Sequence, residues 1–217
     1  MNDVHARFFP QLLRRYPRIP DIVEIGFNTG HSSYLFLSSL PDVRVLSFDL
    51  GEGEIVDVAK RLIDQRFPSR HELIRGDSRQ TVPAFADANP GRHFDLIFID
   101  GGHEYDVASS DIANCENLGG PQSFAIIDDI NPWSWGVGPT NAWRDAIATD
   151  LVDPLLLLED GFPLCDVALA DVRPLQRGWV VGRYRSGRSA PGTPDRPSPG
   201  LAFIAKLRGK IALTEEK

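Results

Sequence analysis

The chain has 217 residues and a mass of 24.0 kDa, which fits one good-sized domain with a substantial core. Its 42% hydrophobic and 24% charged residues exclude a disordered chain, and its formal net charge of -7 argues against nucleic acid as the main partner. Its two cysteines, Cys115 and Cys165, are too few for a disulfide framework and lack the CxxC spacing of structural zinc. With no long apolar run and no signal-peptide core, the sequence predicts a cytoplasmic protein without a membrane partner.

Strand-like and helix-like segments alternate through the first 127 residues. An amphipathic helix is expected over 2–17, interrupted or ended near Pro10, and a strand over 21–25 then leads into the glycine loop 26–30. The elements expected next are a helix over 31–40, a strand over 43–49, a helix over 55–67, a strand over 72–75, a helix over 81–88, a strand over 94–100, a helix over 106–118 and a strand over 123–127. This alternation predicts an α/β fold with a Rossmann-like, doubly wound and mostly parallel sheet.

The pattern loosens after residue 127. Thr140 is expected to cap a helix over 141–151, and further strands are expected over 155–158, 167–170 and 179–184. The segment 186–200, SGRSAPGTPDRPSPG, has the composition of a flexible linker. We therefore expect one domain over 1–185, a linker over 186–200 and a C-terminal tail over 201–217.

The glycine loop lies between a buried strand and a helix, in the segment VEIGFNTGHSS at 23–33. Its GxxxG spacing matches neither the GxGxxG fingerprint for pyrophosphate nor the P-loop. Glycines here let the backbone approach a ligand, and the helix start offers free N–H groups. A purely structural turn is the alternative for this motif taken alone.

Polar residues follow the next two strands. Asp49 ends the second strand, where an acid can accept both hydroxyls of a ribose, and Asp77 and Ser78 follow the third strand, where they can meet an adenine edge. The carboxyl ends of successive parallel strands converge on one crevice. The set predicts a nucleoside ligand that carries a carboxylate and an amine rather than phosphates.

Three acids end the fourth and fifth strands, in FDLIFID and FAIIDD. Asp100, Asp128 and Asp129 should meet, and their mutual repulsion would be relieved by Mg²⁺ or a similar cation. Loop capping, pairing with an arginine and substrate binding are the alternatives. His103, in DGGHEYD, is the candidate general base because its ordinary pKa lies near neutrality, and a hydrogen-bonded loop histidine is the other interpretation.

Aromatic residues follow the acidic pair. Trp133 and Trp135 lie in a Gly/Pro-rich loop and are candidates for the wall of a substrate pocket, although they could pack under the last helix instead. Trp143 is expected in the core, and His71 at the surface.

These motifs, taken in order over roughly residues 20–150, resemble a class I S-adenosylmethionine (SAM)-dependent methyltransferase of the catechol O-methyltransferase-like and macrolide-sugar O-methyltransferase groups. The resemblance implies about seven strands with the last one reversed. It also implies cofactor contacts, with Glu24 and Gly26 beside the methionine moiety, Ser32 near its carboxylate, Asp49 at the ribose and Asp77 or Ser78 near the adenine; Asn28, Gly30 and Asp100 complete the expected cofactor-binding residues. Asp129 stands where the catechol group has Asn, as in the macrolide-sugar group.

The resemblance implies transfer of the sulfonium methyl group, most simply to a hydroxyl oxygen of a small-molecule acceptor. SAM is the expected cofactor, a divalent metal the expected assistant, and His103 and Asp100 the catalytic candidates. N-methylation, metal-assisted hydroxylation and a non-catalytic nucleoside-binding protein stay open, because a fold does not fix a function. A homo-oligomer is also possible on this reading.

Overall fold

The computed structural model describes residues 3–15, 20–131, 135–159, 162–164 and 178–185. One eight-stranded sheet forms the centre of the fold, in the order β3-β2-β1-β4-β5-β8-β6-β7. The strands are β1 Asp21–Ile25, β2 Arg44–Asp49, β3 His71–Arg75, β4 Phe94–Ile99, β5 Gly119–Ile130, β6 Val152–Glu159, β7 Phe162–Leu164 and β8 Gly178–Tyr184. β1 to β5 pair in parallel, whereas β8 runs antiparallel to β5 and β6. The expected Rossmann-like sheet with a reversed last strand is confirmed, and β7 is a short addition.

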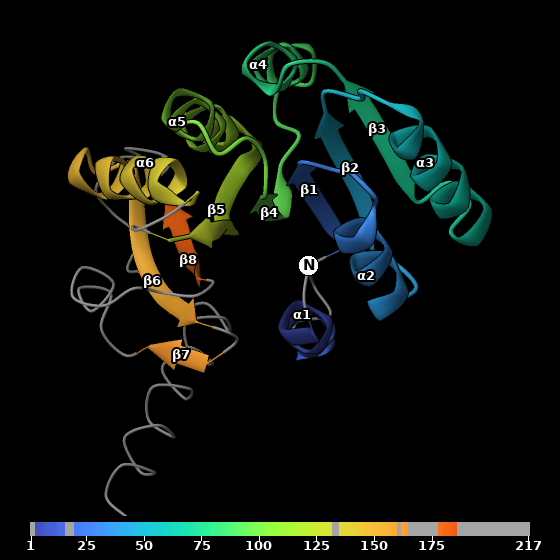
Figure 1. Cartoon of the computed structure of the whole chain (residues 1–217), viewed down its shortest axis with the longest axis horizontal. Helices are drawn as coiled ribbons and strands as arrows, with labels where there is room; N and C mark the ends of the chain where they lie inside the picture. Colours follow the sequence, from blue (N-terminus) through green and yellow to red (C-terminus); the bar gives the residue numbers. More distant parts are fainter. Residues whose placement is uncertain (1–2, 16–19, 132–134, 160–161, 165–177, 186–217) are drawn as a thin grey trace, which may run out of the picture.

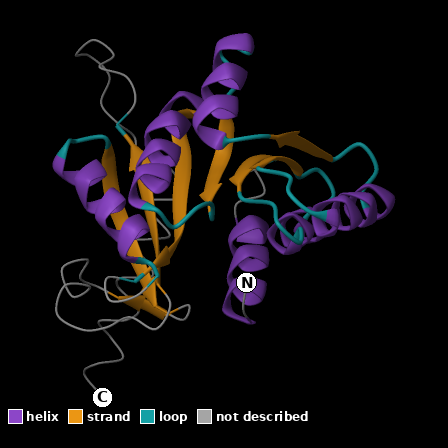
Figure 2. Cartoon of the chain, turned by 45° about the horizontal axis from the view of Figure 1, so that its top comes forward, coloured by secondary structure: helices purple, strands orange, loops and turns teal. Residues whose placement is uncertain are grey.

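Helices cover both faces of this sheet (Figures 1 and 2). They are α1 Asp3–Arg15, α2 His31–Ser39, α3 Glu54–Arg66, α4 Ser78–Ala88, α5 Tyr105–Asn114 and α6 Val137–Ala148, with a 3-10 turn over Cys115–Leu118. Buried residues of α1, α2 and α3 belong to one apolar cluster, and those of α4, α5 and α6 to another, with the sheet between them. No helix in the described ranges is long and apolar enough to cross a membrane.

The expected break at Pro10 is wrong, because α1 continues through it. The buried side chains of Phe9 and Leu13 hold the helix against the sheet. The Phe9 ring makes edge or tilted contacts with Phe36 at 4.9 Å and with Trp179 at 5.4 Å between ring centroids. This aromatic packing outweighs the hydrogen bond that a proline removes.

Several element ends differ from the sequence-based expectation. α4 begins at Ser78 because the Asp77 carboxylate caps it, accepting a 3.0 Å hydrogen bond from the Arg79 amide. α6 begins at Val137, so Thr140 is a buried helix residue rather than a cap. Trp143 is buried as expected, and the expected strand at 167–170 lies outside the described residues.

Candidate functional site

The glycine loop joins the end of β1 to α2 through three positions of positive φ, Gly26 with φ 94°, Asn28 with φ 46° and Gly30 with φ 71°. The loop is fixed to both neighbouring strands: the Gly26 amide donates to the Phe48 carbonyl at 2.8 Å, and the Asp100 amide donates to the Ile25 carbonyl at 2.9 Å. A Cβ on Gly26 would lie 2.0 Å from the Asp100 carbonyl oxygen. Only glycine fits at this position, which confirms that the motif forms a close-packed turn.

Asp49, at the end of β2, holds the glycine loop in place through hydrogen bonds to backbone amides. Its Oδ2 accepts hydrogen bonds from the amides of Phe27 at 2.9 Å and Asn28 at 2.8 Å, and its Oδ1 accepts one from the Gly51 amide at 2.7 Å. A carboxylate has about four lone-pair sites, so one acceptor position remains for a ligand. Asp49 therefore shapes the loop in addition to any role at a ribose, which the sequence did not indicate.

A pocket of about 410 Å³ opens beside this loop, at the carboxyl ends of β1, β2, β3 and β4. Six of the nine expected cofactor-binding residues line it, namely Gly26, Asn28, Asp49, Asp77, Ser78 and Asp100. The exposed side chains of Leu50 and Ile55 add an apolar wall that the sequence reasoning missed. Polar groups at one end and apolar side chains at another suit a nucleoside, whose sugar is polar and whose base is flat.

Glu24, Gly30 and Ser32 do not line the pocket. The Glu24 carboxylate is fully buried and accepts hydrogen bonds from the hydroxyls of Ser32, Ser33 (2.5 Å) and Ser47 (2.6 Å). Burial raises the pKa of Glu24 to about 7, although the three hydroxyls oppose the shift. The expected contacts of Glu24 and Ser32 with the methionine moiety stay predictions, because the serine hydroxyl donates to Glu24 here.

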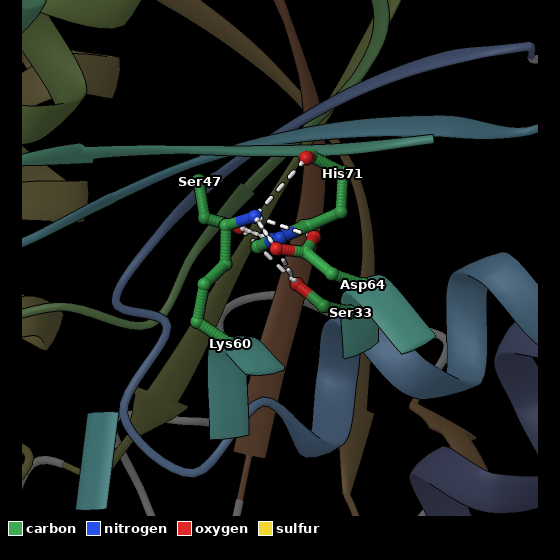
Figure 3. Close-up of polar contacts among 5 residues, drawn as sticks. All are labelled: Ser33, Ser47, Lys60, Asp64 and His71. Carbon is green, nitrogen blue, oxygen red and sulfur yellow. Dashed lines mark hydrogen bonds and ion pairs between the residues drawn. The ribbon is translucent and has the colours of Figure 1, made fainter. Parts of the chain in front are cut away.

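His71, at the start of β3, extends this buried network, so its expected surface position is wrong. Its Nε2 lies 3.0 Å from the Ser47 hydroxyl and 3.4 Å from that of Ser33, and its ring stacks on Phe27 at 4.9 Å. Figure 3 shows these serines around the imidazole, with Lys60 and Asp64 beside it. Burial and the Lys60 charge lower the pKa of His71 to about 4, so the ring is neutral at physiological pH.

A second, much smaller cavity of about 10 Å³ brings together the acids of the fourth and fifth strands. Asp100, Asp128, Asp129 and His103 all line it, as the strand order predicted. Burial and then the charges of Asp128 and Asp129 hold the pKa of Asp100 well above its usual range. Asp100 and the two glycines after it also line the larger pocket, so the two spaces share a wall.

His103 and Asp129 form a pair that the sequence did not predict. The His103 Nε2 lies 2.7 Å from Asp129 Oδ2, and Asp129 itself has a left-handed backbone with φ 60°. The Asp129 amide donates to Asp128 Oδ1 at 2.8 Å. The exposed Trp135 ring lies 5.3 Å from the His103 ring, whereas Trp133 is outside the described residues.

The acids do not form a ready metal centre. In the part of the chain that the structure describes, no group of three or more His, Cys, Asp or Glu side chains is arranged to hold a metal ion. Asp129 makes its short contact with His103 instead. The expected metal therefore stays a prediction.

Asp77 lines the pocket, but its carboxylate is hydrogen-bonded to a neighbouring side chain. Both of its carboxylate oxygens accept hydrogen bonds from the Arg79 guanidinium, one at 2.9 Å and one at 2.5 Å, which lowers the pKa of Asp77. The pair is largely solvent-exposed. Asp77 caps α4 and holds Arg79 at the pocket rim, and its expected contact with adenine is untested.

The part of the chain with this geometry matches a known family. A family model described as a methyltransferase domain matches residues 23–130, from β1 to the end of β5. The chain belongs to this methyltransferase family. The methyltransferase resemblance drawn from the glycine loop and the ordered acids is thereby confirmed. A separate search of curated proteins finds no match.

Solved structures with the same fold include several methyltransferases. An O-methyltransferase from Bacillus cereus, in complex with S-adenosylhomocysteine (SAH), has 16% identity and a TM-score of 0.65, over 84% of this chain and 82% of that one. The SAH-bound methyltransferase PaMTH1 of Podospora anserina has 16% identity and a TM-score of 0.62, over 85% and 80%. The O-methyltransferase TomG of Streptomyces achromogenes, in complex with SAM, has 18% identity and a TM-score of 0.62, over 85% and 81%. At these identities the likeness establishes the fold.

Proposed function

We propose that this methyltransferase binds SAM and transfers its methyl group to a hydroxyl oxygen of a small molecule. The observation that carries the proposal is the shared wall of Asp100, Gly101 and Gly102 between the larger pocket and the acidic cavity. A cofactor in the larger pocket would have its reactive end beside a base and three acids. The solved relatives described as O-methyltransferases with bound SAH or SAM support the same cofactor and the same kind of acceptor.

SAM carries the reactive electrophile, so the protein has to align the partners, accept a proton and exclude water. Bound SAM would supply an electrophilic methyl group to the acceptor oxygen and would leave as SAH, and the hydroxyl proton would need a base. His103 is the base for that proton. With Nε2 donating to Asp129 Oδ2, the neutral imidazole offers Nδ1 as the acceptor, and the carboxylate stabilises the imidazolium that forms.

A divalent cation is a second element of the proposal. Asp100, Asp128 and Asp129 have the hard oxygen ligands that Mg²⁺ prefers. Burial and then the charges of Asp128 and Asp129 raise the pKa of Asp100, and this repulsion between acids is a reason for a counter-ion. These three residues would hold the ion, although their present side-chain positions do not form a complete ligand set. A bound cation would lower the pKa of an acceptor hydroxyl.

The surroundings of His103 favour an acceptor with an apolar, ring-like part. Tyr105, Trp135 and Val137 are exposed apolar side chains near this histidine in sequence or space. The backbones of these segments touch, because a Cβ on Gly138 would lie 2.0 Å from the His103 carbonyl oxygen. N-methylation, metal-assisted hydroxylation and non-catalytic nucleoside binding are the competing functions.

Turnover can be measured as SAH formation from SAM with a panel of phenolic, sugar and amine acceptors. We expect a hydroxyl acceptor to be methylated, and His103→Gln to lower kcat by about 10²–10⁴-fold with little change in cofactor affinity. His93→Gln, at an exposed histidine, is the matched control. Methylation of amines alone would contradict an oxygen acceptor, and SAH binding without turnover on any acceptor would favour the non-catalytic alternative.

The cation is tested in the same assay. EDTA should abolish turnover and Mg²⁺ or Mn²⁺ should restore it, while Asp128→Asn should depress kcat more than SAM affinity. Full activity in EDTA would remove the cation from the mechanism and leave His103 and Asp129 as the proton-accepting pair.

A further inference from the structure

Two glycines at the start of α6 contact the two segments that carry the His103–Asp129 pair. A Cβ on Gly136 would lie 2.2 Å from the Asp129 carbonyl oxygen, and a Cβ on Gly138 would lie 2.0 Å from the His103 carbonyl oxygen. Neither glycine has a positive φ, so the backbone conformation does not require glycine at these positions. Within α6, alanine would be the better helix former at position 138. The close approach of another backbone is therefore the reason for glycine at both positions.

α6 is itself fixed to the sheet, so it can serve as a support for these segments. It lies beside α5 (Figure 1), and its buried residues Ala142 and Trp143 belong to the apolar cluster that includes Ile127 of β5. The Trp143 ring packs on Gly182 of β8, since a Cβ on that glycine would lie 2.5 Å from a carbon of the ring. The first turn of α6 is thus held by packing against β5 and β8.

A side-chain hydrogen bond adds a second connection between α6 and the His103 segment. The hydroxyl of Tyr105, the first residue of α5, donates to Asp145 Oδ2 of α6 at 2.6 Å. The Tyr105 amide nitrogen also takes part in the backbone contact, 2.8 Å from a Cβ on Gly138. The segment from His103 to Tyr105 therefore touches α6 at two places, one of them backbone against backbone.

The His103–Asp129 hydrogen bond depends on how these two segments are spaced. His103 lies in the loop after β4, and Asp129 lies near the end of β5. The distance of 2.7 Å between Nε2 and Oδ2 is at the short end of the hydrogen-bond range, and a displacement of about 1 Å would break the bond. Backbone contacts have no rotamers through which they could adjust, so they set this spacing more rigidly than side chains could.

We propose that Gly136 and Gly138 are positioning residues, which hold Asp129 and His103 at hydrogen-bonding distance through backbone contacts. This inference rests on the proposed function, because it takes His103 as the base. The bond to Asp129 keeps the proton of the neutral imidazole on Nε2, which leaves Nδ1 free to accept the proton of the acceptor hydroxyl. A wider spacing would release the ring and let its proton move between the two nitrogens.

The first test removes the close approach at each glycine. In Gly136→Ala and Gly138→Ala, the added methyl group has to push two backbones apart. Each variant should lower kcat by about tenfold to 10²-fold, the effect of a misplacement of about 1 Å, and should leave the acceptor KM and the SAH affinity unchanged. Gly120→Ala, at the opposite end of β5, is the matched control and should keep the wild-type kcat, because an added Cβ there meets nothing closer than 3.6 Å.

Two kinetic results would overturn the inference. One is a wild-type kcat in both glycine variants. The other is a raised acceptor KM with an unchanged kcat, because the methyl group would then obstruct the acceptor and leave the base in place.

A spectroscopic measurement needs no turnover, and so it separates this inference from the proposed function. The NMR signals of the His103 ring nitrogens show which nitrogen carries the proton, and their loss in His103→Gln identifies them. At about pH 8.5, where a histidine side chain is ordinarily neutral, wild-type protein should carry the proton on Nε2 and both glycine variants should show a mixture. Wild-type signals in both folded variants would overturn the inference. The expected mixture in a protein that methylates no acceptor would support the positioning contacts and contradict the proposed base.

Asp145→Ala keeps the inference testable if the glycine variants do not fold. It removes the hydrogen bond to Tyr105 without a collision, because Asp145 is exposed. It should lower kcat by about two- to tenfold, the range for one hydrogen bond, and shift the ring signals in the same direction. Asp87→Ala, at an exposed acid on α4, should change neither. Unfolded glycine variants together with wild-type kcat and ring signals in Asp145→Ala would show that the two glycines serve the fold alone.

Discussion

The larger pocket and the acidic cavity are built from neighbouring strand ends, yet their polar groups are satisfied in different ways. In the pocket, Asp49 accepts three backbone amides and the glycine loop is hydrogen-bonded to both adjacent strands. In the cavity, the acids face one another, and the pKa of Asp100 is held high by burial and by its neighbours. The pocket is therefore ready for a ligand, whereas the cavity depends on a proton, a cation or an acceptor to balance its charge.

The glycine loop offers the largest expected effect on the pocket side. Gly26→Ala should abolish SAH binding and lower the unfolding free energy by more than about 2 kcal/mol, because its Cβ would meet backbone atoms at 2.0 Å. Gly53 also has a positive φ, 85° with ψ 156°, but an added Cβ there meets nothing within 4 Å. Gly53→Ala should therefore cost about 1–3 kcal/mol through backbone strain alone and keep binding, as calorimetry and thermal unfolding can show.

Equal losses in the two variants would mean that backbone strain, and not the collision with the Asp100 carbonyl, determines the effect. That result would contradict the claim that close packing against the Asp100 carbonyl restricts position 26 to glycine.

The raised pKa of the buried Glu24 carboxylate leads us to expect that stability depends on pH. The pKa of Glu24 rises from 4.5 to about 7 on folding, so the folded state binds more protons in that window and stability should fall as pH rises through it. The largest contribution is roughly 3 kcal/mol, since each unit of pKa corresponds to about 1.4 kcal/mol. Glu24→Gln should remove this slope, measured as the difference in unfolding free energy from the wild type between pH 5 and about 8.

The titration of His71 changes the unfolding free energy with pH in the opposite direction to that of Glu24. It therefore limits the pH range in which the effect of Glu24 can be measured by itself. Its pKa falls from 6.5 to about 4 on folding, so its contribution to stability rises with pH between those values. Above pH 6.5 the Glu24 contribution alone remains from this pair. Glu72→Gln, at an exposed glutamate on β3, is the control and should leave the slope unchanged. An unaltered slope in Glu24→Gln would contradict a protonated, buried Glu24.

A smaller effect is expected at Asp49, which holds the glycine loop through backbone amides and is the proposed ribose ligand. Asp49→Asn should weaken SAH binding by about 1.5–3 kcal/mol, because the acceptor loses its charge. The structure adds that the unfolding free energy should fall too, since the amides of Phe27 and Asn28 lose a charged acceptor. Asp42→Asn, at an exposed loop acid, should change neither quantity. Weaker binding at full stability would mean that Asp49 serves the ligand alone.

The pocket was largely predictable because its signals are local. A strand, two glycines and a helix start lie within 15 residues, Asp49 is the last residue of β2, and Asp77 lies two residues beyond the end of β3. The residues that line the acidic cavity were predictable, but the contact between His103 and Asp129 was not, because it depends on side-chain positions and on a positive φ at Asp129 that no sequence pattern indicates. The buried position of His71 depends on Phe27 and Ser47, which come from two other parts of the chain.

The burial of Asp111 on α5, whose side chain is 1% exposed, was missed although the sequence contains a signal for it. Ala108, Ile112 and Cys115 are buried at helical spacing around it, so an acid on this face stands out from its neighbours. A single acid in a helix otherwise carries no motif. The boundaries at 185 and 200, and a possible homo-oligomer, stay predictions, since the tail lies outside the described residues.

Calorimetric titration of the wild-type chain with SAH tests the central claim, that the pocket beside the glycine loop binds the cofactor of a methyltransferase. We expect saturable binding of one ligand per chain, retained in Gly53→Ala and absent in folded Gly26→Ala. Absence of saturable binding to folded wild-type protein, or undiminished binding in Gly26→Ala, would contradict it.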